Sequence, residues 1–200
     1  MLFRSGGSDN LMYPPAPQLD RRIWQATFSV EGGRRAGLAG DGLLLSRTQP
    51  RPATAPDATL PEIQDPILDA YYAALPPGVA PRILGSRSIF VADNRAEARR
   101  YAEIGLGRFI ARIGKLGRAV PKGSLDDLIA AFDVHMGTPD EVIESLSHDT
   151  TLNRVTDVAG QVHSVDPPHP LILRSIELFA TVVAPGMGWV SAPQLERTGT

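Results

Sequence analysis

Hydroxyl groups and glycines gather in one short stretch of the chain, Ala26-Thr-Phe-Ser-Val-Glu-Gly-Gly33. β-Branched and aromatic residues predict a strand over residues 22–29, and residues 30–39 predict a helix, so the stretch is a strand-to-helix turn. The first N–H groups of a helix lack an internal acceptor, and the helix dipole favours an anion there. The turn could therefore bind a phosphate. The alternative is that Ser29 only caps the helix, and the spacing alone favours this simpler role.

Three further side chains stand where predicted strands end. Arg47 follows an apolar strand over residues 43–46 and opens a long loop. It could bind a phosphate or a carboxylate, or it could pair with a nearby aspartate. Gln161 and His163 end a strand predicted over residues 155–163, at the edge where the active sites of barrels lie. These three are candidate substrate-binding residues, although a hydrogen-bonded edge residue is the simpler interpretation of His163.

The composition argues against several classes of function. The net charge is −2, and the glycine-diluted basic run over residues 115–122 lacks aromatic residues, so we expect no nucleic-acid partner. There is no cysteine, and the four histidines share no one-turn spacing, so we expect no metal site. No apolar run reaches the length of a membrane span, and the first residues lack the apolar core of a signal peptide. We therefore expect no membrane contact and a cytoplasmic chain.

Strands and helices alternate along the chain, which predicts an α/β fold with a parallel sheet. The predicted strands are residues 22–29, 43–46, 82–92 and 155–163. The predicted helices are residues 30–39, 66–75, 95–114, 125–132, 139–147 and 171–183. Local capping signals mark three of the helix starts: Asp65 before Pro66, Asp93 or Asn94, and the capping box of Thr138 and Glu141. Four βα units are half of a (β/α)8 barrel.

The ends of the chain differ in composition from its middle. Residues 1–20 are rich in Gly, Pro and polar residues and predict an extended lead-in segment, and residues 189–200 predict a flexible tail. Residues 21–188 predict one folded body, which agrees with the length of 200 residues.

Four segments carry a pattern that recurs in a known family. They are Ile23 to Leu45, with its Ser-bearing turn and Gly-Asp-Gly, then Ile89-Phe-Val-Ala-Asp-Asn-Arg-Ala-Glu-Ala98, Gly137-Thr-Pro-Asp-Glu-Val142, and Val183-Ala-Pro185. In this order they resemble the luciferase-like FMN-dependent monooxygenases of the bacterial luciferase superfamily, over residues 11–188. The resemblance implies a partial TIM (β/α)8 barrel, in which four parallel βα units correspond to strands five to eight with an inserted helical excursion.

The resemblance also implies a reaction and a cofactor site. Members of the family use reduced FMN and O2 to oxygenate small organic substrates, and a separate NAD(P)H-dependent reductase often supplies the reduced flavin. Related barrels use a deazaflavin in hydride transfer, and this alternative stays open. In the family, the turn after strand five contacts the flavin phosphate. On this chain the corresponding residues are Thr27, Ser29, Val30, Glu31 and Gly32.

The strands that carry most of the family's flavin-ring pocket have no counterpart among these 200 residues, so no catalytic residue is transferred. We expect the isolated chain to be inactive, a fragment of its family's barrel, and to form a homodimer or pair with a missing amino-terminal half. The alternative from another class is a non-catalytic half-barrel that binds a phosphate ligand or a partner.

Overall fold

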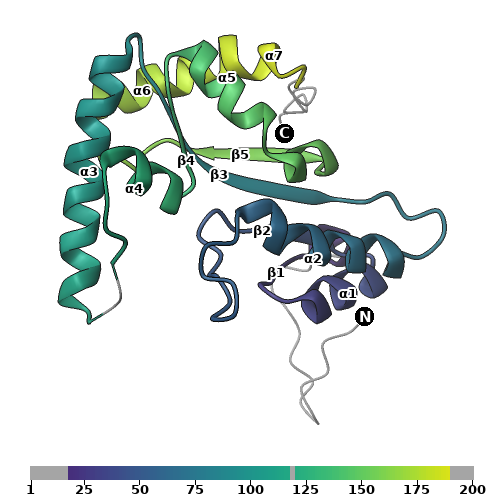
Figure 1. The fold of residues 1–200 in the computed structure, drawn as a ribbon. Coiled ribbons are helices and arrows are strands. Elements are labelled where there is room, and N and C mark those ends of the chain that lie inside the picture. Colours follow the sequence, from purple (N-terminus) through teal and green to yellow (C-terminus); the bar gives the residue numbers. More distant parts are fainter. Residues whose placement is uncertain (1–17, 118–119, 190–200) are drawn as a thin grey trace. The chain divides into compact units, whose positions relative to one another are not determined.

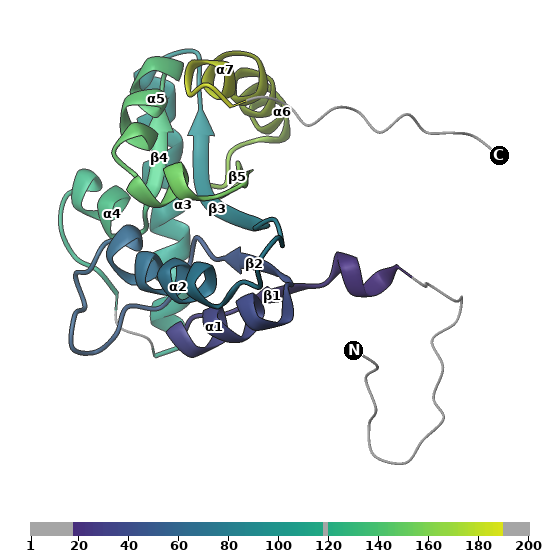
Figure 2. The same ribbon diagram turned by 90° about the vertical axis from the view of Figure 1, so that its right-hand side faces the viewer.

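The computed structural model describes residues 18–117 and 120–189 (Figures 1 and 2). The fold is α/β, with a five-stranded sheet in which every pairing of defined register is parallel. The described residues form two compact units: those up to Ser86 with Thr151–Ala159, and those from Arg87 to Thr150 with those from Gly160 onward. The predicted lead-in segment and tail lie outside the described residues, apart from residues 18–20 and Trp189.

In the first unit, helices connect parallel strands. Strand β1 (Trp24–Ala26) pairs with β2 (Gly42–Leu45), and β2 pairs with the start of β3 (Ile83–Val91). Helix α1 (Val30–Ala39) links the first two strands, and α2 (Leu60–Ala74) precedes the third. These elements confirm the predicted alternation. The short helix η1 (Leu19–Arg22) ends just before β1, so β1 begins later than predicted.

The core of the first unit lies between its sheet and its two helices. Helices α1 and α2 lie side by side in both views (Figures 1 and 2). A Cβ atom on Gly37 would collide with the carbonyl oxygen of Tyr71, so the helices approach closely where α1 has no side chain. The buried apolar residues are Ala36, Leu43, Leu45, Ile67, Leu68, Tyr71 and Ile83.

Helix α2 corrects one prediction. It begins at Leu60, not at Pro66, because Thr59 and Glu62 form a capping box, in which the Thr59 N–H donates to Glu62 Oε2 at 2.7 Å. Asp65 therefore caps no helix, and Pro66 lies inside α2. The Asp65 carboxylate instead accepts a hydrogen bond from the Thr151 hydroxyl at 3.0 Å.

In the second unit, the later part of β3 pairs in parallel with β4 (Val134–Gly137). The prediction of four strands was therefore wrong by one. β4 has only four residues between two helices, and its pairing with residues 88–91 of β3 stabilises it. Strand β5 (Asp157–Gln161) follows η2 (Thr150–Arg154) and also pairs with β3. It is shorter than the predicted residues 155–163 at both ends, so His163 lies in the turn after the strand.

Helices cover the strands of the second unit. After β3 come α3 (Arg95–Lys115), α4 (Leu125–Ala131) and, after β4, α5 (Pro139–Ser147). After β5, α6 (His169–Leu178) begins two residues earlier than predicted. It continues as a π-helical turn, η3 (Phe179–Val183), and ends in α7 (Ala184–Gly186).

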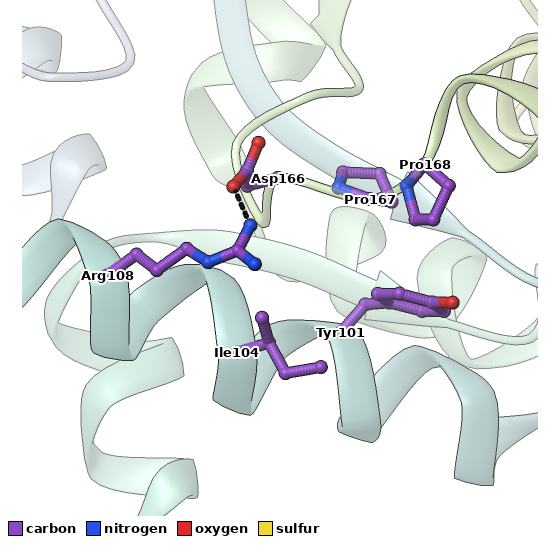
Figure 3. A pocket seen from close by; sticks show the side chains of 6 residues that line it. All are labelled: Tyr101, Ile104, Arg108, Asp166, Pro167 and Pro168. Carbon is purple, nitrogen blue, oxygen red and sulfur yellow. Dashed lines mark hydrogen bonds and ion pairs between the residues drawn. The ribbon is translucent and has the colours of Figure 1, made fainter.

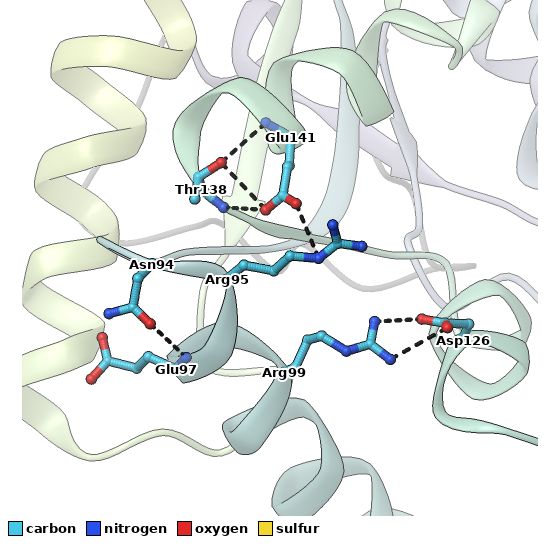
Figure 4. Close-up of polar contacts among 7 residues, drawn as sticks. All are labelled: Asn94, Arg95, Glu97, Arg99, Asp126, Thr138 and Glu141. Atoms are coloured by element: carbon cyan, nitrogen blue, oxygen red, sulfur yellow. Dashed lines mark hydrogen bonds and ion pairs between the residues drawn. The ribbon is translucent and has the colours of Figure 1, made fainter.

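The capping signals predicted for α3 and α5 are confirmed. Asn94 Oδ1 accepts from the Glu97 N–H at 2.9 Å, and Thr138 and Glu141 form the predicted capping box (Figure 4). The Arg95 guanidinium lies 3.3 Å from Glu141. The buried core of this unit consists of Phe90, Ala92, Ala98, Ala102, Leu106, Val134 and Val165.

Replacing Gly37 with Ala tests the close packing of α1 on α2. The added methyl group would overlap the main chain of Tyr71, so we expect G37A to lower the free energy of unfolding by about 1–3 kcal/mol. The matched control is Gly107→Ala in α3, where a methyl group meets no other atom and should stabilise the helix by about 0.5–1 kcal/mol. Urea unfolding of both variants measures the difference, and equal effects would contradict the packing.

Candidate functional site

The turn between β1 and α1 is held by its own hydroxyl groups. Ser29 is extended, with φ −130° and ψ 148°, and its Oγ accepts from the Gly32 N–H at 3.1 Å. The Ser29 N–H in turn donates to Thr27 Oγ1 at 3.1 Å. Ser29 therefore caps α1, which is the simpler of the two roles considered from the sequence. Binding of a phosphate by this turn stays a prediction.

The same turn keeps groups that suit an anion. Val30 and Glu31 are the first two residues of α1, where a helix offers no acceptor for the N–H groups. Ser29 Oγ accepts from Gly32 and lies 3.3 Å from Thr27 Oγ1, so its own O–H can donate outward when Thr27 is the donor between the two hydroxyl groups. A Cβ atom on Gly32 would collide with the Thr27 side chain, so glycine lets the two hydroxyl groups sit against the helix start. The donors present fit a phosphate group.

The charge of Glu31 is compensated within α1. Its carboxylate lies 2.7 Å from the Arg34 guanidinium, and both side chains are exposed. The hydrogen bond from Arg34 lowers the pKa of Glu31, so the carboxylate is ionised at neutral pH. Arg34 thus offsets, at the surface of the first helical turn, a negative charge that would otherwise oppose a phosphate.

A second polar turn lies at the same edge of the sheet. Ala26 of β1 is paired with Leu44 of β2, and parallel strands present their carboxyl ends together. The turn after β2 therefore starts next to the Ser29 turn. In it, the Ser46 and Thr48 hydroxyl oxygens lie 3.2 Å apart. The predicted edge position of Arg47, between them, is confirmed. Partial burial lowers the pKa of the Arg47 guanidinium, which stays cationic at neutral pH.

Two buried glutamines near this turn were missed by the sequence analysis. Gln64 is fully buried in α2, and its Nε2 donates to the Ser46 carbonyl oxygen at 2.9 Å. Nε2 of the buried Gln49 contacts the Ile63 carbonyl oxygen at 3.4 Å. Within the described residues, neither Oε1 atom has a hydrogen-bond partner. Buried acceptors usually find a donor in protein, water or ligand. These unpaired buried acceptors could not be predicted from the sequence, because they arise only when residues 46–64 fold together.

Gln161 and His163 lie in the second unit, whereas the Ser29 turn and Arg47 lie in the first. Gln161 is the last residue of β5, and its Nε2 lies 2.7 Å from Nε2 of His163. The donor and acceptor roles in this contact depend on the tautomer of His163. The structure brings these two side chains together. Their contact with a substrate stays a prediction.

A buried polar cluster in the second unit was also missed. Arg87 is fully buried, and its Nε lies 2.5 Å from Oδ2 of Asp149. His135 of β4 hydrogen-bonds through Nδ1 to the Ser145 hydroxyl of α5 at 2.9 Å. A serine beside a histidine is the pattern of a nucleophile and its base.

This cluster is nevertheless structural. Burial lowers the pKa of His135 to about 4; the Asp149 carboxylate partly opposes this shift and the Arg87 charge adds to it. A histidine with such a pKa is a weak base at neutral pH. Asp149 is held by two nitrogens of Arg87 and does not orient the imidazole. The described residues also contain no group of three His, Asp or Glu side chains that could bind a metal ion.

The structure resembles those of luciferase-like monooxygenases, as the sequence resemblance predicts. The monooxygenase RslO1 from Streptomyces bottropensis is 25% identical, with a TM-score of 0.55 over 82% of this chain. The oxygenating constituent of 3,6-diketocamphane monooxygenase from Pseudomonas putida, solved in complex with FMN, is 19% identical, with a TM-score of 0.56 over 86%. The coenzyme F420-dependent tetrahydromethanopterin reductase from Methanopyrus kandleri is 15% identical, with a TM-score of 0.51 over 84%.

This chain spans about half the length of those proteins: the aligned regions cover 47%, 50% and 52% of them. No protein-family model matches the sequence, and a comparison with curated proteins finds no relative. In the described part of the chain, no helix has the length and apolar character needed to cross a membrane.

The low pKa of His135 predicts a pH-dependent stability. An unfolded chain protonates this histidine near pH 6.5, and the folded chain only near pH 4. The unfolded state therefore binds more protons than the folded state between pH 4 and pH 6.5. The stabilisation linked to neutral His135 is complete above pH 6.5. As the pH falls to 4, about 3 kcal/mol of stability is lost.

Urea unfolding at several pH values measures this loss. His135→Asn, which cannot titrate, should be less stable throughout but lose less stability between pH 6.5 and 4 than the natural chain. A parallel pH dependence in both proteins would contradict the assignment to His135.

Proposed function

We propose that this chain forms part of a flavin-dependent oxidoreductase that oxygenates a small organic substrate with reduced FMN and O2. The observation that carries the proposal is the Ser29 turn. It joins exposed hydroxyl and N–H donors to a helix start, at the carboxyl end of a parallel strand. The shared fold with an FMN complex supports the choice of cofactor.

In this proposal the turn holds the phosphate of FMN. The Ser29 O–H and the N–H groups of Val30 and Glu31 donate to phosphate oxygens, and Thr27 supplies a second hydroxyl. Gly32 keeps the approach open, because a side chain there would displace Thr27. FMN, when bound, supplies the oxygen chemistry, and the protein contributes binding, orientation and exclusion of water.

Substrate contact is assigned to the candidates of the sequence analysis. Arg47 stands at the strand end next to the Ser29 turn and remains cationic, so it suits a carboxylate or phosphate oxygen. Gln161 and His163 offer a hydrogen-bonded pair at the end of β5. The identity of the substrate depends on residues beyond these three.

A deazaflavin is the second candidate cofactor. The F420-dependent reductase of similar fold supports it, and the same donors suit a phosphodiester. The reaction would then be hydride transfer without O2. Titration with FMN and with coenzyme F420 separates the two, since the tighter ligand identifies the class of reaction. A non-catalytic half-barrel would bind phosphate compounds without a preference for either cofactor.

Two partners follow from this function. A separate NAD(P)H-dependent reductase would supply the reduced flavin. The second partner is a polypeptide, because β1 is the edge strand of the sheet, with Phe28 and Val30 exposed beside it. An unpaired strand edge invites pairing. We propose that a second copy, or the half-barrel missing relative to the similar structures, covers this edge.

Ser29→Asp separates phosphate binding from capping. Aspartate caps a helix as well as serine does, so we expect an unchanged melting temperature. Its charge lies beside a phosphate dianion, so FMN should bind at least about tenfold more weakly. Riboflavin, which lacks the phosphate, should bind equally to both proteins. Flavin fluorescence titration measures both ligands.

Asn94→Asp is the matched control, because it adds the same charge at the cap of α3 and should change neither affinity. Ser29→Ala removes the donor and should weaken FMN binding by about 1–3 kcal/mol. An FMN affinity equal to that of the natural chain in both Ser29 variants would remove the turn from the cofactor site.

Gel filtration with light scattering tests the exposed edge of β1. We expect the 200-residue chain to elute as a dimer or a larger assembly. A compact monomer with one cooperative melting transition would contradict the proposed pairing.

A further inference from the structure

A cleft in the second unit lies between the middle of α3 and the segment before α6, well outside the residues assigned above. Its volume is about 270 Å³, close to the lower limit for pockets that hold small molecules. We name it the α3 cleft. Its lining residues are Tyr101, Ile104, Arg108, Asp166, Pro167 and Pro168 (Figure 3).

The walls of the α3 cleft are fixed by close packing. A Cβ atom on Gly105 would collide with the main chain of Val165, so the segment before α6 lies directly on α3. Val165 is fully buried, and Tyr101 packs edge-to-face on Phe90 with ring centroids 6.5 Å apart. The cleft is therefore a preformed feature of this unit.

One end of the cleft is charged and the other is apolar. The Arg108 guanidinium is paired through Nη1 with the carboxylate of Asp166, and both side chains are largely exposed. The other amino group of Arg108 lies on the side of Ile104 (Figure 3). The backbone of Asp166 is in the left-handed region, with φ 51°, a conformation that Asp and Asn tolerate. The ring of Tyr101 and the two prolines form the apolar end.

We propose that the α3 cleft binds a small aromatic carboxylate. The ring would occupy the space between Tyr101, Ile104 and the prolines, and its carboxylate would take the place of Asp166 on Arg108. Asp166 already shows that a carboxylate reaches this guanidinium, and an exposed ion pair contributes little stability that a ligand would have to overcome. This site does not depend on the proposed flavin turn, because all its residues lie in the second unit.

Isothermal titration of the 200-residue chain with 2-naphthoate and with neutral 2-naphthylmethanol tests the proposal. We expect 2-naphthoate to bind with a dissociation constant of about 1 mM or below, and the alcohol about tenfold more weakly. Arg108→Gln should remove that preference. Arg112→Gln, one turn further along α3 and outside the cleft, is the matched control and should keep it.

Two further variants separate binding from a merely structural ion pair. Asp166→Asn keeps the left-handed turn and removes the competing carboxylate, so 2-naphthoate should bind more tightly, by about threefold or more. Ile104→Trp should fill the cleft and abolish binding of both compounds.

Equal affinities for the acid and the alcohol, or an Arg108→Gln variant that behaves like Arg112→Gln, would overturn the proposal. So would weaker binding of 2-naphthoate to Asp166→Asn. Circular dichroism confirms that each variant folds. If Arg108→Gln does not fold, the opposite directions expected of Asp166→Asn and Ile104→Trp decide the question.

Discussion

The parallel pairing of β1 with β2 is the constraint on which the candidate cofactor site depends. Because both strands run in the same direction, their carboxyl ends meet at one edge, and the turns that follow begin side by side. That geometry places the Ser29 turn next to Ser46 and Arg47, which are 17 and 18 positions further along the sequence. Parallel pairing also needs a crossover connection between the strands, which here is α1, and the start of that helix supplies the N–H donors.

Ser29 orders the start of α1, because its Oγ accepts a hydrogen bond from the Gly32 N–H. An ordered helix start can bind an anion through its remaining N–H groups. Where Thr27 is the donor between the two hydroxyl groups, which lie 3.3 Å apart, the Ser29 O–H can donate to a ligand, so capping and binding are compatible roles of one side chain. Arg34 contributes by balancing Glu31. The two interpretations that compete at the level of the sequence therefore become parts of one arrangement in the proposed site.

Burial separates the structural charges of this protein from those available to ligands. Arg87 and Asp149 are buried against each other, and removing either would leave the other charge uncompensated in the core. Arg108 and Asp166 are joined in the same way but at the surface, where the pair is easily exchanged. The same two residue types thus stabilise one part of the second unit and offer a binding group in another.

The βα alternation, the Ser29 turn and the starts of α3 and α5 could be predicted from the sequence, because capping boxes and apolar periodicity are local signals read within a few residues. The capping box that starts α2 is a local signal of the same kind, which the prediction missed. Other features depend on contacts between distant segments. β4 is too short to show a pattern and exists through its pairing with β3. Arg108 meets Asp166 across 58 positions, and Arg87 meets Asp149 across 62. Such pairs are set by the packing of distant segments, and no local pattern of residues encodes that packing.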